Sequence, residues 1–333
     1  MSSKNEEVVP LELVADPLGS VQLPFRPEAH GLSKDFRLSK FGDLRGQRMR
    51  LDRAEILDFL SVFNEDQQDR NFKSHVFGED VSVTHLPHSG LYLVETSNLI
   101  WPVIEDPYLL GKIASTCVLS RIYALGVPDC ASSRFILGVA NRMEENERKV
   151  VIPMVIRGFC DVGKSMAAEV RGSEIFSNPW LVLGGTASVV CPLHELVIPD
   201  SAILGDVIVL TKPLGTLVAI TVAQWMEQTD KRSRLLLTLS EEDAKKGYLR
   251  AVDSMIRSNR IAALLMRKVR SQLLRWIICP ETRSQLANRL GNQSLPWRSE
   301  IPIDCSRWSC CVRRSHPVTA SINRMVSLGD VHT

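Results

Sequence analysis

Short β-favouring runs alternate with helix-period stretches along the middle of the chain, and this alternation limits the possible folds more than any other feature. Residues 91–96 (LYLVET) and 135–139 (FILGV) have the length and apolar content of strands. Between them, residues 106–126 read as a helix, because Asp106 can cap its first turn and Gly126 can end it. The alternation predicts an α/β or α+β fold.

Further segments extend this pattern toward the C-terminus. They are a helix over 145–170 that Pro153 weakens, strands over 180–191 and 206–211, a helix over 217–227, and a helix that Ser240 caps, reaching about Arg257 with more helix as far as Ile278. The pair Gly184 and Gly185 interrupts the strand over 180–191. Glycines inside a strand predict either a bulge or a close backbone contact there.

The chain length, the position of prolines and the changes in composition divide the chain into four parts. The 333 residues suffice for two domains, and Pro192 and Pro199 mark a boundary between them. The first residues are polar and lack a hydrophobic period, which is typical of a mobile arm. The predicted parts are the arm (1–34), a first domain (35–200), a shorter second domain (201–289) and an irregular, mildly basic tail (290–333).

Composition excludes several classes of partner. The net charge is +2, so the molecule has no strong field to attract nucleic acid or an anionic membrane surface. No apolar run approaches the ~18 residues of a spanning helix. The polar start, MSSKNEE, lacks the apolar core of a signal peptide. We therefore expect a cytoplasmic protein without a nucleic-acid or membrane partner.

Cysteine usage agrees with that compartment. Most of the eight cysteines lie in apolar segments and none forms a C-x-x-C pair, so we expect reduced, buried thiols. An alternative is a zinc site made of Cys305, Cys310, Cys311 and His316, although their spacing matches no established zinc pattern.

Six short phrases along the chain give a more specific indication. In order they are 36–41 (FRLSKF), 78–80 (GED), 105–108 (EDPY), 178–185 (NPWLVLGG), 205–215 (GDVIVLTKPLG) and 279–282 (CPET). Each phrase is short, but the ordered set resembles selenophosphate synthetases (selenide, water dikinases), and the animal-type members most closely. The resemblance covers about residues 34–282.

The resemblance implies a fold similar to aminoimidazole ribonucleotide synthetase. In that fold an N-terminal α/β domain pairs with a second copy into a shared β-barrel, and a C-terminal α+β domain follows, which is incomplete in this chain. ATP is expected in the cleft, with Mg²⁺ bridging its phosphates. The implied reaction converts ATP, selenide and water to selenophosphate, AMP and phosphate.

The carboxylates that would hold magnesium are mostly altered. The resemblance places them at Asp80, which is present, at Asn98 and at Arg121, while a fourth segment is missing between residues 263 and 279. Magnesium binds hard oxygen ligands, usually including carboxylates. Asparagine offers only a neutral oxygen, and a guanidinium would repel a dication.

The nucleophile and nucleotide positions are altered as well. Met49 falls at the family's cysteine or selenocysteine and cannot form a thiolate, while Arg50 keeps the positive charge of the family's lysine. A family nucleotide loop reads Gly172-Ser173-Glu174-Ile175 here, and Glu174 adds a negative charge. The positions implied to bind nucleotide are Gly78, Glu79, Asp80, Asn98, Gly172, Ser173, Glu174 and Ile175.

Three hypotheses follow. The first is a catalytically impaired paralogue with a dimerisation or regulatory role, forming a homodimer or a heterodimer with an intact synthetase paralogue. The second is an active selenide, water dikinase in which Arg121 neutralises phosphate directly. The third is a decayed copy that folds poorly because part of the second domain is missing.

Overall fold

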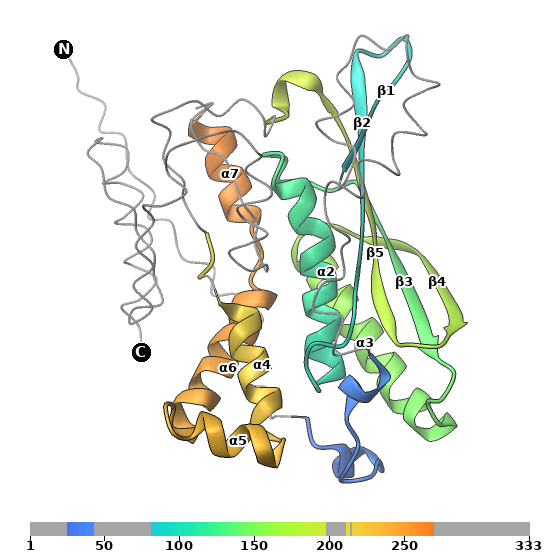
Figure 1. Cartoon of the computed structure of the whole chain (residues 1–333). Helices are drawn as coiled ribbons and strands as arrows, with labels where there is room; N and C mark the ends of the chain where they lie inside the picture. The colour runs from blue at the N-terminus through green and yellow to red at the C-terminus, as the bar shows by residue number, and fades with distance from the viewer. Residues whose placement is uncertain (1–24, 43–80, 198–210, 214, 270–333) are drawn as a thin grey trace, which may run out of the picture.

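The computed structural model describes residues 25–42, 81–197, 211–213 and 215–269, and the structural statements below concern these residues (Figure 1). The elements are η1 (Pro27–His30), η2 (Leu38–Phe41), β1 (Val81–His85), β2 (Leu91–Ile100), α2 (Pro107–Tyr123), β3 (Ser132–Ala140), α3 (Glu145–Ser165), β4 (Val170–Asn178), β5 (Val182–Pro192), η4 (Leu193–Glu195), α4 (Thr216–Met226), α5 (Thr229–Leu235), α6 (Glu241–Ile256) and α7 (Arg260–Val269). None of the helices in the part of the chain that the structure describes is long and apolar enough to cross a bilayer.

The strands form one mixed sheet in the order β1-β2-β5-β3-β4. The pair β3–β4 is parallel, and the other neighbouring pairs are antiparallel. Helices α2 and α3 lie against one face of this sheet, and α4, α6 and α7 pack on the far side of α2 (Figure 1). The predicted mixture of helices and strands is confirmed as a mixed α/β arrangement.

Helix α2 lies at the centre of the molecule. The Asp106 carboxylate accepts a hydrogen bond from the Leu109 backbone N–H (2.9 Å), which confirms the predicted cap. Gly126 has a φ of +75° and follows the helix end at Tyr123 by three residues. Leu110, Val118 and most of the other α2 side chains are buried in a hydrophobic cluster that also contains residues of the sheet, α3, α4, α6 and α7.

Helices α2 and α3 touch through their backbones. A Cβ atom on Gly158 of α3 would lie 2.0 Å from the carbonyl oxygen of Tyr108. A Cβ atom on Gly111 of α2 would likewise lie 2.1 Å from the carbonyl oxygen of Val155. Only glycine permits this approach, so the two positions fix how closely the helices cross.

The glycine pair of β5 shows the same kind of contact. A Cβ atom would lie 1.9 Å from the Asn98 carbonyl oxygen at Gly184, and 2.0 Å from the Arg134 carbonyl oxygen at Gly185. The register with β2 continues through both residues without a shift. Of the two alternatives that the sequence left open, the close backbone contact is therefore the one observed.

Two predicted boundaries differ from the structure. The helix expected over 145–170 ends at Ser165, because Ala167 takes a φ of +54° that stops it, and β4 begins at Val170. The helical stretch after Ser240 is two helices, α6 and α7, separated at residues 257–259. Most of the strand expected over 206–211, and the tail, lie outside the described residues.

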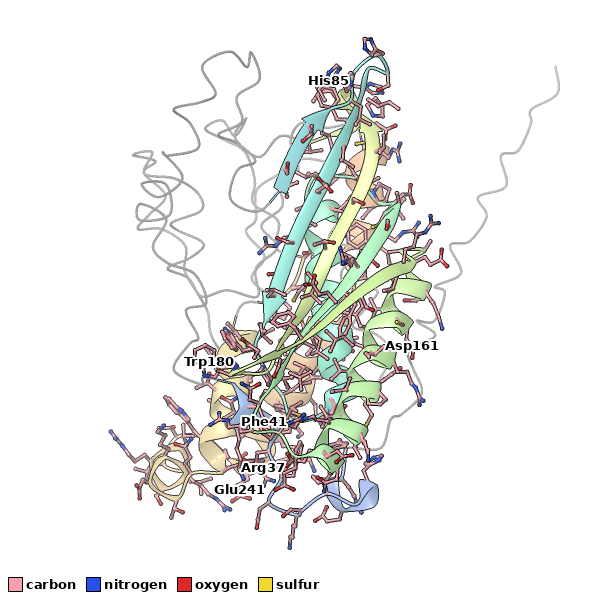
Figure 2. The ribbon with its side chains drawn as sticks, turned by 90° about the vertical axis from the view of Figure 1, so that its right-hand side faces the viewer. Arg37, Phe41, His85, Asp161, Trp180 and Glu241 are labelled. Atoms are coloured by element: carbon pink, nitrogen blue, oxygen red, sulfur yellow. The ribbon has the colours of Figure 1, made fainter. Side chains whose placement is uncertain are left out.

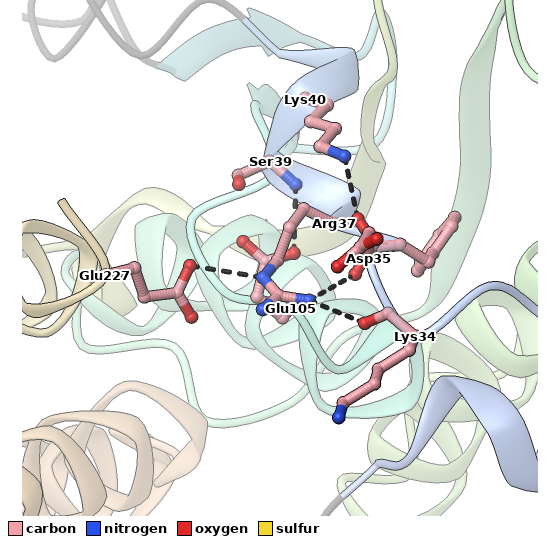
Figure 3. A network of polar contacts seen from close by, with 8 residues as sticks. Lys34, Asp35, Arg37, Ser39, Lys40, Glu105 and Glu227 are labelled. Atoms are coloured by element: carbon pink, nitrogen blue, oxygen red, sulfur yellow. Dashed lines mark hydrogen bonds and ion pairs between the residues drawn. The ribbon is translucent and has the colours of Figure 1, made fainter.

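The N-terminal segment 25–42 is packed onto the core. Leu38 and Phe41 are buried, and so is Leu32, which falls in the stretch expected to belong to the mobile arm. Figure 3 shows its polar anchors: Arg37 Nε contacts Glu227 Oε2 beyond α4 (3.1 Å), and the backbone N–H of Ser39 donates to Glu105 (3.2 Å). The segment thus ties α4 to the residues that precede α2.

The second face of the sheet is not covered by any described element (Figures 1 and 2). Strand alternation places Leu99, Phe176 and Val190 on this face, with exposed fractions of 41%, 42% and 44%. Leu93, which pairs with Val190, is half-buried on the same face. We call this surface, defined by these four residues, the open sheet face.

Candidate functional site

Two of the predicted metal positions lie in direct contact. Asn98 is on β2, with its side chain toward α2, and Arg121 is in the last turn of α2. Arg121 Nη2 donates to Asn98 Oδ1 (3.0 Å), and Nη1 donates to the carbonyl oxygen of Ser97 (3.0 Å). The structure therefore brings together residues that are 23 positions apart in the sequence.

The donor set at this contact does not fit a magnesium ion. Asn98 presents an amide oxygen that already accepts from a guanidinium, and Arg121 has no lone pair to offer a metal. Within the described residues there is no group of three His, Cys, Asp or Glu side chains that could hold a metal ion. Asp80, Gly78, Glu79, Met49 and Arg50 lie outside the described residues.

The predicted nucleotide stretch has a different local structure from the one expected. Gly172, Ser173, Glu174 and Ile175 lie within β4, at the edge of the sheet, so the loop expectation is wrong. All four residues pair regularly with β3. Arg134 Nη2 lies 3.8 Å from the Glu174 carboxylate, so the negative charge is partly offset by a neighbour.

The nucleotide stretch is also distant from the Asn98–Arg121 contact. The strand register places Asn98, Gly185, Phe135 and Ser173 in one row across the sheet. Three strand spacings separate the first from the last, about 14 Å. The predicted site residues that the structure describes therefore lie in two separate places within one chain.

A polar link on the other side of α2 was not predicted. The Thr211 hydroxyl donates to Asn259 Oδ1 (3.2 Å), and Asn259 Nδ2 donates to Ser120 Oγ (3.3 Å). Asn259 is buried, so its hydrogen bond to Ser120 is shielded from water, and the bond from Thr211 is partly shielded. This gives Thr211 a structural role and joins the residues before α4 to α2. A single asparagine between two helices carries no pattern that would have revealed it.

Lys212 follows Thr211 of this link, and its charged ammonium group is largely removed from water. Burial lowers the pKa of its ammonium from 10.5 to about 8, against a smaller opposing effect of Cys117. Asp253 also favours the charged form, but Arg257 opposes it, and desolvation remains the largest influence on this pKa. The ammonium therefore costs stability whenever it is protonated in the folded state.

Lys212→Met is expected to stabilise the protein by about 1 kcal/mol near pH 7. Because the pKa is lowered on folding, the unfolded state holds more protons between pH 8 and 10.5, so wild-type stability rises with pH in that window. The advantage of the methionine variant should shrink as pH rises through it. Urea unfolding of both proteins near pH 7 and near pH 9 checks this; a constant difference would contradict it.

The cysteines in the described part of the chain agree in part with the expectation of reduced, buried thiols. None of these described cysteines forms a disulfide; Cys130 and Cys191 are buried, whereas Cys117 and Cys160 are only partly buried. Burial raises the pKa values of the Cys130, Cys160 and Cys191 thiols, which favours the protonated form over the nucleophilic thiolate. The alternative zinc ligands, Cys305, Cys310, Cys311 and His316, lie outside the described residues.

Sequence comparison finds many relatives among characterised proteins. The chain is 36% identical over 264 residues to selenide, water dikinase 3 of Danio rerio, covering 73% of this chain and 59% of that protein. It is 34% identical over 270 residues to selenide, water dikinase 2 of Homo sapiens, covering 73% and 60%. The selenide, water dikinase of Dictyostelium discoideum is 30% identical over 265 residues, covering 80% and 70%.

Other comparisons are weaker. No protein-family model matches the chain. Among solved structures, thiamine monophosphate kinase from Aquifex aeolicus overlaps with a TM-score of 0.46 at 15% identity, covering 65% of this chain and 66% of that one. The sequence relatives are therefore the ones that define the family.

The identity and coverage of these relatives define a single class, enzymes named for the phosphorylation of selenide and water. The chain belongs to the selenide, water dikinase (selenophosphate synthetase) family. It spans about three-fifths of the length of the zebrafish and human relatives. The family resemblance expected from the ordered sequence phrases is thereby confirmed.

Proposed function

We propose that this chain is a catalytically impaired selenophosphate synthetase-like protein that acts by pairing through its open sheet face. The observation that carries the proposal is that face: a five-stranded sheet with Leu99, Phe176 and Val190 exposed, opposite a fully packed helical layer. Exposed apolar patches of this kind mark interaction sites. The occupant is the same face of a second synthetase-type protomer, either a copy of this chain or an intact paralogue.

Impaired catalysis is supported by the Asn98–Arg121 contact. Phosphoryl transfer depends on metal ions that neutralise the charge on the phosphates, and magnesium is held by oxygen ligands with carboxylates among them. Here an amide and a guanidinium stand at two of those positions, and Met49 stands at the nucleophile position. Retention of ATP and Mg²⁺, which the family reaction uses, is therefore not expected.

The second candidate function is an active selenide, water dikinase in which Arg121 neutralises phosphate directly. The positive charge of Arg121 favours this candidate. Arginine can bind phosphate through its planar fork without a metal. In the structure, however, two of the guanidinium N–H groups are directed at Ser97 and Asn98. This use of the guanidinium supports impaired catalysis over activity.

Two measurements on the purified full chain test the proposal. Selenide-dependent release of AMP from ATP is expected to be absent, or at least about 10³-fold slower than for an intact family enzyme measured alongside. Light scattering is expected to give the mass of a dimer, alone or after mixing with the intact enzyme. Turnover at the rate of the intact enzyme would contradict the impairment, and a strictly monomeric chain under both conditions would contradict the pairing.

A further inference from the structure

We propose that the Arg121 guanidinium is a resident cation that takes the place of a divalent metal between β2 and α2, so that this junction is held together without magnesium. The inference rests on the part of the proposed function that concerns the altered metal positions, and it is independent of pairing. On this proposal Arg121 stabilises the fold, and its presence is more than the loss of a metal-binding carboxylate.

The surroundings of Arg121 select for a cation. The residue lies in the last turn of α2, where the unpaired carbonyl groups give the helix end a partial negative charge. The Ser97 carbonyl oxygen and Asn98 Oδ1 add two acceptors at 3.0 Å each. A guanidinium satisfies such acceptors with fixed, planar N–H groups, and needs no coordinating carboxylate.

Asn98 and Arg121, which stand at two positions where the resemblance implies carboxylates, suit each other chemically. With aspartates at both positions, two carboxylates would face each other across the β2–α2 junction and would require a cation between them. With asparagine and arginine, the cation is covalently part of the chain and its partner is neutral. The junction then carries its own positive charge, which disfavours entry of a dication.

Thermal unfolding of the full chain, in a chelator and in millimolar MgCl₂, tests this replacement. The wild-type melting temperature is expected to be the same in both conditions. Asn98→Asp/Arg121→Asp is expected to melt lower than wild type in chelator, and to recover on the order of 5 °C when Mg²⁺ is added. Asn98→Asp alone is expected to melt at or above the wild-type temperature without a Mg²⁺ response, because its carboxylate pairs with Arg121.

Arg257→Asp is the matched control for a newly created pair of carboxylates. Arg257 Nη2 contacts Asp253 Oδ2 at 2.6 Å on the exposed surface of α6, so the variant places two carboxylates one helical turn apart away from the junction. It is expected to show no Mg²⁺-dependent recovery. A recovery equal to that of the double variant would show a general salt effect and would overturn the inference.

If Asn98→Asp/Arg121→Asp fails to fold, thermal unfolding of Arg121→Leu still tests the proposal. This variant removes the cation without adding a carboxylate, and it is expected to melt several degrees lower than wild type in chelator. A wild-type melting temperature for Arg121→Leu would overturn the structural role. Calorimetric titration of the wild-type chain with MgCl₂ alone should show no binding heat; saturable binding would overturn the replacement of the metal. Neither result depends on AMP release or on dimer mass.

Discussion

Gly158→Ala is expected to lower the free energy of unfolding by about 3 kcal/mol or more, which corresponds to a melting temperature roughly 10 °C lower. The added methyl group would lie 2.0 Å from the carbonyl oxygen of Tyr108 and 2.9 Å from its carbonyl carbon. Both are backbone atoms of α2, so no side-chain rotation relieves the overlap. The helices must separate, and the cluster that contains Leu110 and Phe159 loses its packing.

Gly247→Ala is the matched control for this prediction. Gly247 is also inside a helix, α6, but a Cβ atom there would meet only the Cβ of Ala219, at 3.9 Å. Alanine is the better helix former by about 1 kcal/mol, so this variant should be slightly more stable than wild type. Urea unfolding measures both. Equal effects of the two substitutions would show that the α2–α3 backbone contact does not limit the crossing.

Val190→Asp is expected to weaken pairing of the chain by at least about 100-fold. Val190 is 44% exposed on the open sheet face and pairs with Leu93 of β2. A carboxylate at this position would be buried without a partner when a second sheet covers the face. The folded protomer should be unaffected, because the side chain faces solvent when the chain is alone. Light scattering over a dilution series gives the change in dissociation constant.

Val218→Asp controls for the introduction of a charge at an exposed valine. Val218 is 56% exposed on α4, and this helix lies on the far side of α2 from the sheet (Figure 1). Its substitution should leave the mass distribution unchanged. Pairing that survives Val190→Asp, or that is lost equally in both variants, would place the interface elsewhere.

Local signals predicted the helices better than the strands. Asp106 and Ser240 cap α2 and α6 as their sequence positions indicate. Strand β4 was missed, because most of its side chains are exposed and polar, and the alternation that identifies a half-buried strand is absent. Its place is set by parallel pairing with β3, which is a tertiary contact that local sequence does not encode.

The candidate site was predicted in part. The sequence identified Asn98 and Arg121 as altered positions, each judged separately against the family pattern. Their hydrogen bond depends on how α2 crosses β2, and that geometry follows from packing of the whole core. The same reason explains why the link from Thr211 through Asn259 to Ser120 was missed, since its residues come from three separate parts of the chain.

The N-terminal segment sets a limit on how this protein can be shortened. Residues 36–41 bury Phe36, Leu38 and Phe41 in the same cluster as α2, and Arg37 holds Glu227 from far along the chain. A protease cut or an internal translation start that removed these residues would uncover apolar surface on a domain that already exposes the open sheet face. We expect such a fragment to be less stable than the full chain and to be degraded faster in a cell.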